Sequence, residues 1–150
     1  MKSVFEKETA EELIGRINKL NPGAQPLWGK MGSAQMLAHC NVTYELIYDT
    51  IHPRPGGFKK FILKLLVKNI VVSEKPYKRN SPTSPEFLIR DDKDFEKEKE
   101  RLIGYIRQTC ELGAPHFDGK ESHSFGKLSV NEWNNMLYKH LDHHLTQFGV

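Results

Sequence analysis

The segment Ser129-Val-Asn-Glu-Trp-Asn-Asn-Met-Leu-Tyr-Lys-His-Leu-Asp-His-His-Leu-Thr-Gln-Phe148 decides the fold of this 150-residue chain. Ser129 and Glu132 have the spacing of a capping box, which predicts that a helix begins here. Apolar residues then recur at helical intervals on one face, and this face includes His144 with His140 beside it. Both imidazoles are therefore expected to point into a core.

The spacing of these histidines indicates a metal site. At about 100° per residue, His140 and His144 lie roughly 40° apart around the helix, so their rings can converge, whereas the neighbours His143 and His144 splay apart. A third ligand must come from elsewhere, and His39 in Gln35-Met-Leu-Ala-His39 is the best candidate. Three nitrogens with one open position are typical of a reactive zinc site.

Other interpretations of the histidines stay open at this stage. Of His140 and His144, one could be a hydrogen-bonded core residue and the other a surface residue, and His39 could cap an apolar face. His143 is expected to line a pocket or meet solvent. His123 occupies a glycine-flanked loop, where it could contact substrate, supply a fourth ligand or stabilise the loop.

The rest of the chain predicts an all-α fold. Period-3.6 patterns predict four long helices, which run between Thr9 and Asn21, from Ala34 to about Thr50, from Asp91 or Asp92 to Gly113, and from Ser129 to Phe148. A shorter helix is expected from Phe58 to Val72, and the proline-rich residues 73–90 are expected to form an exposed loop. We predict one domain, residues 1–150, folded as a four-helix bundle with an extra short helix in a long central crossover.

Several local expectations follow from the same patterns. Thr9-Ala-Glu-Glu12 has capping-box spacing, and Ser33 can cap the second helix. Ile51 and Leu112 are expected to extend the buried faces of the second and third helices, and Trp28 is expected to be buried in the core. Gly113-Ala-Pro115 is expected to end the third helix, and residues 116–128 are expected to form a loop.

Composition narrows the classes of protein. The formal charge of +3 is spread along the chain, which argues against a nucleic-acid-binding surface. Cys40 and Cys110 fall in predicted helices as small apolar residues of a reducing compartment, without a disulfide framework. No apolar signal core and no run of about 20 apolar residues occur, so we expect a cytoplasmic protein without stable membrane insertion.

Lys60, Lys64 and Lys68 form a stripe at i,i+4 spacing beside apolar residues. This stripe could lie on an anionic membrane or bind an acidic partner. The solvated polar face of an ordinary amphipathic helix is the favoured interpretation.

Gln35-Met-Leu-Ala-His39, together with His123 to Trp133 and His140-Leu-Asp-His-His144-Leu-Thr-Gln147-Phe148-Gly149, resembles the DinB-like superfamily of metalloproteins. The resemblance is to a poorly characterised branch with a His-Leu-Asp-His-His C-terminal helix. It implies a four-helix bundle in which His39, His140 and His144 hold a divalent metal, usually zinc or nickel. Related members include thiol transferases that use bacillithiol or mycothiol, and possible hydrolases.

The sequence therefore predicts a metal-dependent enzyme that activates a water or a low-molecular-weight thiol toward a small-molecule substrate. The alternative is a non-catalytic module that binds a metal or small ligand. Whether two bundles pair as a homodimer is left open by the sequence.

Overall fold

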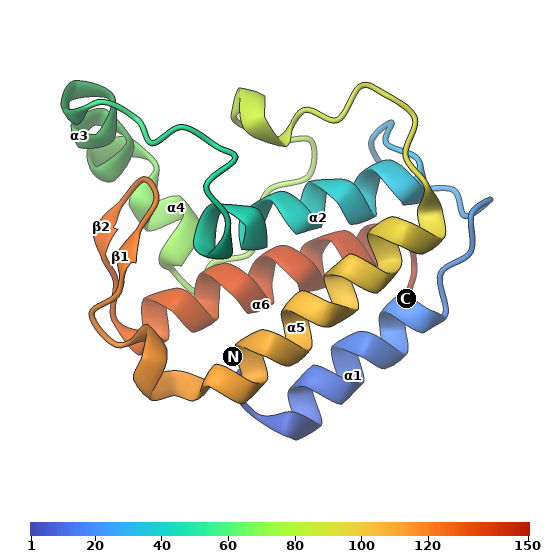
Figure 1. Ribbon diagram of the computed structural model, residues 1–150. Coiled ribbons are helices and arrows are strands. Elements are labelled where there is room, and N and C mark those ends of the chain that lie inside the picture. The colour runs from blue at the N-terminus through green and yellow to red at the C-terminus, as the bar shows by residue number, and fades with distance from the viewer.

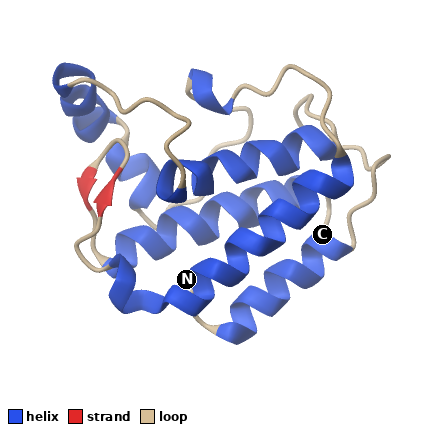
Figure 2. Cartoon of the chain, viewed as in Figure 1, coloured by secondary structure: helices blue, strands red, loops and turns tan.

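The computed structural model of the chain describes residues 1–150 and consists almost entirely of helices (Figure 1, Figure 2). The elements, in chain order, are α1 (Lys7–Asn18), α2 (Ser33–Tyr48), α3 (Gly57–Leu66), α4 (Lys68–Val72), a 3₁₀ turn η1 (Pro85–Phe87), α5 (Phe95–Phe117), β1 (Glu121–Ser122), β2 (Gly126–Lys127) and α6 (Val130–Gln147).

Four long helices, α1, α2, α5 and α6, lie side by side and enclose the main core (Figure 1). The core is a cluster of 17 buried apolar residues to which all four helices contribute, including Leu13, Met36, Leu102 and Leu141. A smaller cluster around Phe117 and Trp133 closes the end nearest the hairpin. The predicted all-α fold is confirmed, and none of the helices is long and apolar enough to cross a membrane.

The capping box predicted at the start of α6 is confirmed. Glu132 N–H donates to Ser129 Oγ at 3.3 Å, and Ser129 N–H donates to Glu132 Oε2 at 2.9 Å. Two backbone N–H groups that the helix itself cannot pair are thus satisfied. This cap fixes where α6 begins and hence where its histidines face.

The caps predicted for the other long helices are wrong. α1 starts at Lys7, so Thr9 is buried within the helix instead of capping it. Gly32 precedes α2, and Ser33 belongs to its first turn and donates to the Pro22 carbonyl. Asp94, not Asp91 or Asp92, accepts from Lys97 N–H and caps α5. At α1 and α2 the residues Glu6 and Gly32 precede the helix without a side-chain cap hydrogen bond, so the spacing of capping residues did not locate either start.

Three predicted core positions are also wrong. Ile51 lies beyond the end of α2 and is exposed, and Leu112 is exposed just before the break in α5. Trp28 is half-buried at the surface, where the Arg79 guanidinium lies 4.3 Å from the centre of its ring. Its aromatic face therefore packs against a cation instead of the core.

The connection between the third and fourth long helices, which the sequence assigned to a loop, contains short elements. α5 breaks at Gly113, where φ is +69°, and a final turn containing Pro115 continues to Phe117. β1 and β2 then pair Glu121 with Lys127 in a hairpin. A break at a glycine with positive φ costs little, because glycine has no side chain to clash.

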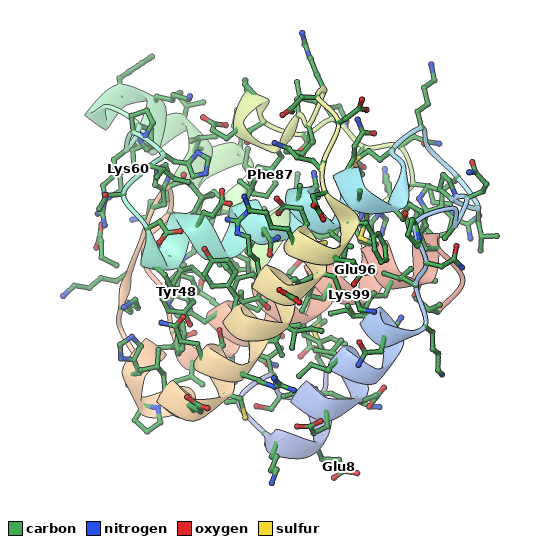
Figure 3. All side chains as sticks on the ribbon, turned by 45° about the vertical axis from the view of Figure 1, so that its right-hand side comes forward. Glu8, Tyr48, Lys60, Phe87, Glu96 and Lys99 are labelled. Atoms are coloured by element: carbon green, nitrogen blue, oxygen red, sulfur yellow. The ribbon has the colours of Figure 1, made fainter.

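The central crossover, residues 49–94, differs most from its prediction. The expected single helix is two, α3 and α4, which are separated at Val67. The expected burial of the apolar face of α3 is wrong, since α3 has no buried residue. The following loop is not wholly exposed either. Phe87, labelled in Figure 3, packs against His39 of α2, and Tyr77 packs against His140 of α6.

Candidate metal centre

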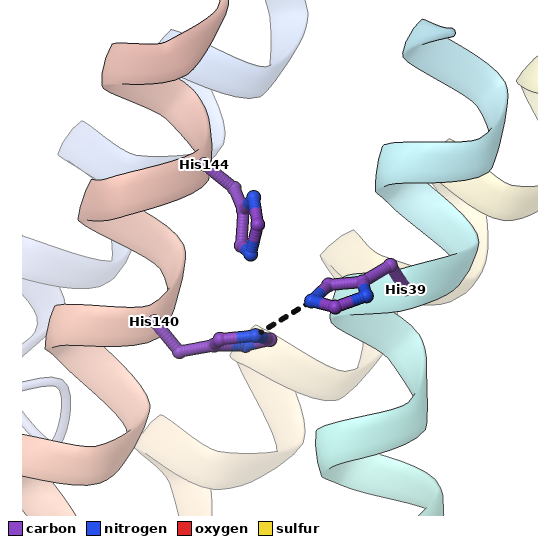
Figure 4. A group of neighbouring side chains, drawn as sticks. All are labelled: His39, His140 and His144. Carbon is purple, nitrogen blue, oxygen red and sulfur yellow. Dashed lines mark hydrogen bonds between the residues drawn. The ribbon is translucent and has the colours of Figure 1, made fainter. Parts of the chain in front are cut away.

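His39 from α2 and His140 and His144 from α6 converge in the space between the two helices (Figure 4). The Nε2 atoms of His39 and His140 lie 3.1 Å apart, and one ring nitrogen from each of the three histidines lies within 4.8 Å of the others. Residues separated by about 100 positions in sequence are thus brought together by the packing of α2 on α6. The three residues proposed from sequence form one cluster.

The outer nitrogens of two of these rings are held by acceptors. His39 Nδ1 lies 2.9 Å from the Phe87 carbonyl oxygen, and His144 Nδ1 lies 2.8 Å from Gln147 Oε1. Since a carbonyl oxygen only accepts, each Nδ1 carries the proton and donates it. Nε2 is therefore the unprotonated nitrogen of His39 and of His144, and His39 Nε2 accepts from His140 Nε2.

The remaining supports of the centre come from α2 and from the loop before it. Thr43 Oγ1 lies 3.0 Å from His140 Nδ1. Gln147 Nε2 donates to the Trp28 carbonyl at 2.7 Å, which fixes the side-chain oxygen toward His144. A hydrogen bond on the outer nitrogen of each ring is the arrangement that orients histidine ligands around metals.

Burial keeps the three imidazoles neutral. Loss of solvation lowers the pKa of His39, lowers that of His140 well below its usual range, and lowers that of His144 to about 3. The proximity of His144 and His39 lowers the pKa of His140 further. Neutral imidazole is the form that donates a lone pair to a metal.

Two aromatic side chains of the crossover cover the centre. The Phe87 ring lies 5.1 Å from that of His39 and 5.8 Å from that of His140, centre to centre. The Tyr77 ring lies 6.5 Å from that of His140. The crossover therefore restricts the access of water to the histidines.

A cavity of about 200 Å³ lies next to the centre. Tyr77 lines this cavity and also packs against His140. His143, Arg79 and Lys139 line it together with Trp28. Burial lowers the pKa of Lys139 to about 8. Asp142 also lines the cavity, which thus carries basic, acidic and aromatic groups beside the three-histidine cluster.

The other two histidines considered from sequence, His123 and His143, lie in different places. His143 is outside the cluster, with its ring 5.0 Å from that of His144, and it forms part of the cavity wall. His123 lies in the turn between β1 and β2, where Nδ1 is 2.9 Å from Ser124 Oγ and Nε2 is 3.4 Å from the His52 carbonyl oxygen. These contacts attach His123 to the start of the crossover and not to the cluster.

The donor set fits a divalent transition metal. Imidazole nitrogens suit zinc and nickel, and nitrogens bound to one zinc ion at about 2.0–2.1 Å in a tetrahedron lie roughly 3.3 Å apart. The 3.1 Å between His39 and His140 is close to that spacing. No carboxylate or thiolate joins the group, so the protein could supply three ligands and leave further positions open to an exogenous ligand.

A second buried polar cluster lies along α2 and α5. Glu45 accepts from both Arg101 and His52, and Arg101 donates to Glu98 Oε2 at 2.8 Å. Asn41 Nδ2 also donates to Glu98 Oε2 at 2.8 Å. This cluster joins α2, α5 and the start of the crossover.

Sequence reasoning missed the residues that hold the histidines in place. One of them had a usable signal, because Gln147 follows His144 by three residues, which puts it beside that histidine on the helix. Thr43 had none, since it contacts His140 across two helices. The Phe87 carbonyl had none, since a backbone oxygen in a loop carries no side-chain identity.

The fold and the cluster define an all-α protein with three histidines that could hold a metal ion. The chain belongs to the family described as "Protein of unknown function (DUF1569)", which matches residues 4–149. No curated protein and no solved structure is significantly similar to it.

Proposed function

We propose that the protein is a divalent-metal-dependent enzyme that acts on a small molecule through a water or a low-molecular-weight thiol. The observation that carries this proposal is the convergence of three neutral imidazoles with their outer nitrogens already hydrogen-bonded. Three protein nitrogens are the ligand count of open, reactive zinc sites, whereas closed structural sites use four. We further propose zinc or nickel as the native ion and DinB-like as the type of bundle.

The residues of the chain have distinct roles in this proposal. His39, His140 and His144 would hold the ion, and Phe87 and Gln147 keep the first and last of these rings oriented. A divalent ion here would lower the pKa of a water or thiol at its open position, which makes a nucleophile available near neutral pH. Arg79 and His143 in the adjoining cavity would orient an anionic or polar part of the substrate.

Thiol transfer is tested with bacillithiol or glutathione and a chlorinated nitroaromatic electrophile. In this reaction a carbon–sulfur bond forms, the carbon–chlorine bond breaks, chloride leaves and the thiol proton passes to solvent. Metal-loaded protein should form thioether faster than the buffer and faster than metal-treated H144A. If no thioether forms above background with either thiol, the transferase version is wrong and hydrolysis of small esters or amides is the reaction to assay.

A second candidate function is a non-catalytic metal-binding module. It is favoured by the aromatic cover over the centre and by the lack of a carboxylate among the cluster that could act as a base. Asp142, the acid nearest in sequence to the pair, is bound to Arg16 at 2.7 Å. Such a module would fill the remaining positions of the ion with protein groups.

Cobalt substitution separates the two candidates. The visible absorption of the cobalt-loaded protein should change when azide or a thiol is added if an exchangeable position is open, as the enzyme requires. A spectrum that no added ligand changes would favour the binding module.

A further inference from the structure

The crossover presents an apolar surface to solvent that the proposed function does not use. Large apolar side chains along α3 and α4 recur at helical spacing, and five of them are more than 60% exposed: Phe58 (82%), Phe61 (61%), Leu65 (67%), Leu66 (63%) and Ile70 (61%). We call residues 57–72 the arm. In Figure 1, α3 projects beyond the ends of the bundle helices. Monomeric soluble proteins seldom expose such a contiguous apolar stripe without a binding role.

The polar side of the arm faces the protein. Lys60 forms an ion pair with Glu121 of the hairpin, and Lys68 forms one with Glu132 of α6. These contacts turn Lys60 and Lys68 toward the bundle and leave Lys64 and the apolar stripe exposed. The arm is therefore turned outward relative to an ordinary amphipathic surface helix, which buries its apolar face.

Hydrogen bonds to α6 fix the arm in this orientation. Lys139 Nζ donates to the carbonyl oxygens of Ile70 and Ser73, and Asn135 Nδ2 donates to that of Val72 at 3.0 Å. Both donors come from α6, on which α4 packs. The exposed stripe is thus presented by an anchored element.

The charge around the arm selects the kind of partner. Residues 50–73 contain five Lys or Arg residues and no Asp or Glu. Ion pairs with Glu86, Glu121 and Glu132 involve three of these cations, and Arg54 and Lys64 form none. Exposed ion pairs are weak, so the paired lysines can exchange a carboxylate for another anion at little cost.

We propose that the arm binds the surface of an anionic lipid bilayer. Phe58, Phe61 and Leu65 would enter the boundary between headgroups and acyl chains, and Lys59 and Lys64 would contact lipid phosphates. A basic helix with Phe and Leu on its apolar face is the type that lies in the plane of the interface. The binding is peripheral, since no helix of the chain can span a membrane.

A second copy of the chain is a less suitable occupant. In a two-fold symmetric dimer the same patch meets itself, so the cations around one arm would face those around the other. Like charges facing each other across an interface disfavour association. An anionic bilayer instead complements both the apolar stripe and its cations.

Co-sedimentation with vesicles tests the proposal. The full chain should bind mixed phosphatidylcholine–phosphatidylglycerol vesicles and not pure phosphatidylcholine vesicles. Raising the ionic strength from about 0.1 M to about 1 M should weaken the binding, because the Debye length falls from about 10 Å to about 3 Å. Binding that is equal for both vesicle types, or no binding to either, would overturn the proposal.

Paired variants locate the binding surface. F61E/L65E should bind anionic vesicles at least tenfold more weakly than the unsubstituted chain. L27E/L112E adds the same two negative charges at exposed leucines outside the arm. It should lose only the affinity that the change in net charge removes. K59Q/K64Q should lose roughly fivefold per lysine, and K19Q/K97Q should lose much less. Circular dichroism confirms that each variant is folded.

Two outcomes contradict the assignment of the arm. One is unchanged vesicle binding by F61E/L65E. The other is a dimer in sedimentation velocity that F61E/L65E dissociates, without vesicle binding by the unsubstituted chain, which would identify a second copy as the occupant. Neither outcome affects the three-histidine centre, which the arm does not contact.

Discussion

Two buried polar clusters contact α2, and they differ in whether their groups complement one another. In the cluster on α2 and α5, Arg101 lies between the carboxylates of Glu45 and Glu98, so opposite charges meet within the protein. In the cluster between α2 and α6, three neutral imidazoles direct ring nitrogens toward one space and no acid joins them. In the first cluster acids and a base pair with one another, whereas the second contains no opposite charge and could hold a cation.

This difference distinguishes a structural network from a ligand site. Buried charges that are paired and hydrogen-bonded need no further partner, and removing one of them leaves the other uncompensated. Converging lone pairs gain little from each other, and they are useful only when they share a proton or a metal. Substitutions in the Arg101 cluster should therefore affect stability, and substitutions in the histidine cluster should affect metal binding.

The largest expected effect is the loss of metal from H144A. The substitution removes one of three ligands, so the metal content of protein prepared without an affinity tag should fall from about one ion per chain to nearly none. Elemental analysis measures this. The matched control is H116A. His116 is exposed on α5, and its ring nitrogen contacts Lys120 and none of the three histidines of the cluster. Equal metal content in both variants would remove His144 from the site.

A smaller effect on the same site is expected from Q147L. Gln147 Oε1 accepts a hydrogen bond from His144 Nδ1, and Gln147 is not itself one of the proposed ligands. Loss of such an outer contact typically weakens metal binding by about 10–100-fold. Titration against a chromophoric chelator measures the affinity, and Q108L on the exposed side of α5 is the control. An affinity unchanged in Q147L would show that the hydrogen bond does not orient the ring.

The complementary experiment is R101M, which should change stability and not metal affinity. Glu45 and Glu98 are buried and would lose their counter-charge. Because Arg101 is itself about one-third exposed, the expected decrease in the free energy of unfolding is about 1–3 kcal/mol, below the range for fully buried pairs. Chemical denaturation measures it, with R107M as the exposed control. A weakened metal affinity in folded R101M would mean that the two clusters are coupled.

The smallest effect concerns pH. The pKa of His144 is about 3 in the folded protein and about 6.5 in the unfolded chain. Below about pH 6.5 the unfolded chain therefore takes up a proton that the folded state does not, and the free energy of unfolding of the metal-free protein falls with pH. The contribution of this side chain is at most about 1.4 kcal/mol per pH unit. Denaturation of H144L at several pH values should show a shallower dependence, and identical slopes would refute the assignment.

Much of the fold could be predicted from sequence because the relevant signals are local. The spacing of His140 and His144 and the apolar period of α6 depend only on helix geometry, which tertiary packing did not alter. The position of His39 on α2 was predicted in the same way. The starts of α1 at Lys7 and of α5 at Phe95 were not predicted correctly. Capping residues at several positions fit the local pattern, and that pattern does not distinguish among them.

The arm shows the limit of pattern reasoning. Its spacing predicts an amphipathic helix correctly, but the spacing is the same whether the apolar stripe faces the core or solvent. Its orientation depends on contacts with residues far away in sequence, namely the hydrogen bonds from Asn135 and Lys139 of α6 and the ion pairs of Lys60 and Lys68 with acids 61 and 64 residues away. The cover of the metal centre by Tyr77 and Phe87 depends similarly on the path of a long crossover.

X-ray absorption spectroscopy of tag-free protein loaded with zinc or nickel tests the central claim most directly. The account predicts a first coordination shell with three imidazole nitrogens and at least one oxygen ligand. Addition of a small thiol should replace that oxygen with sulfur. A spectrum without imidazole scattering, or one that is the same for the unsubstituted chain and for a variant lacking both His140 and His144, would contradict it.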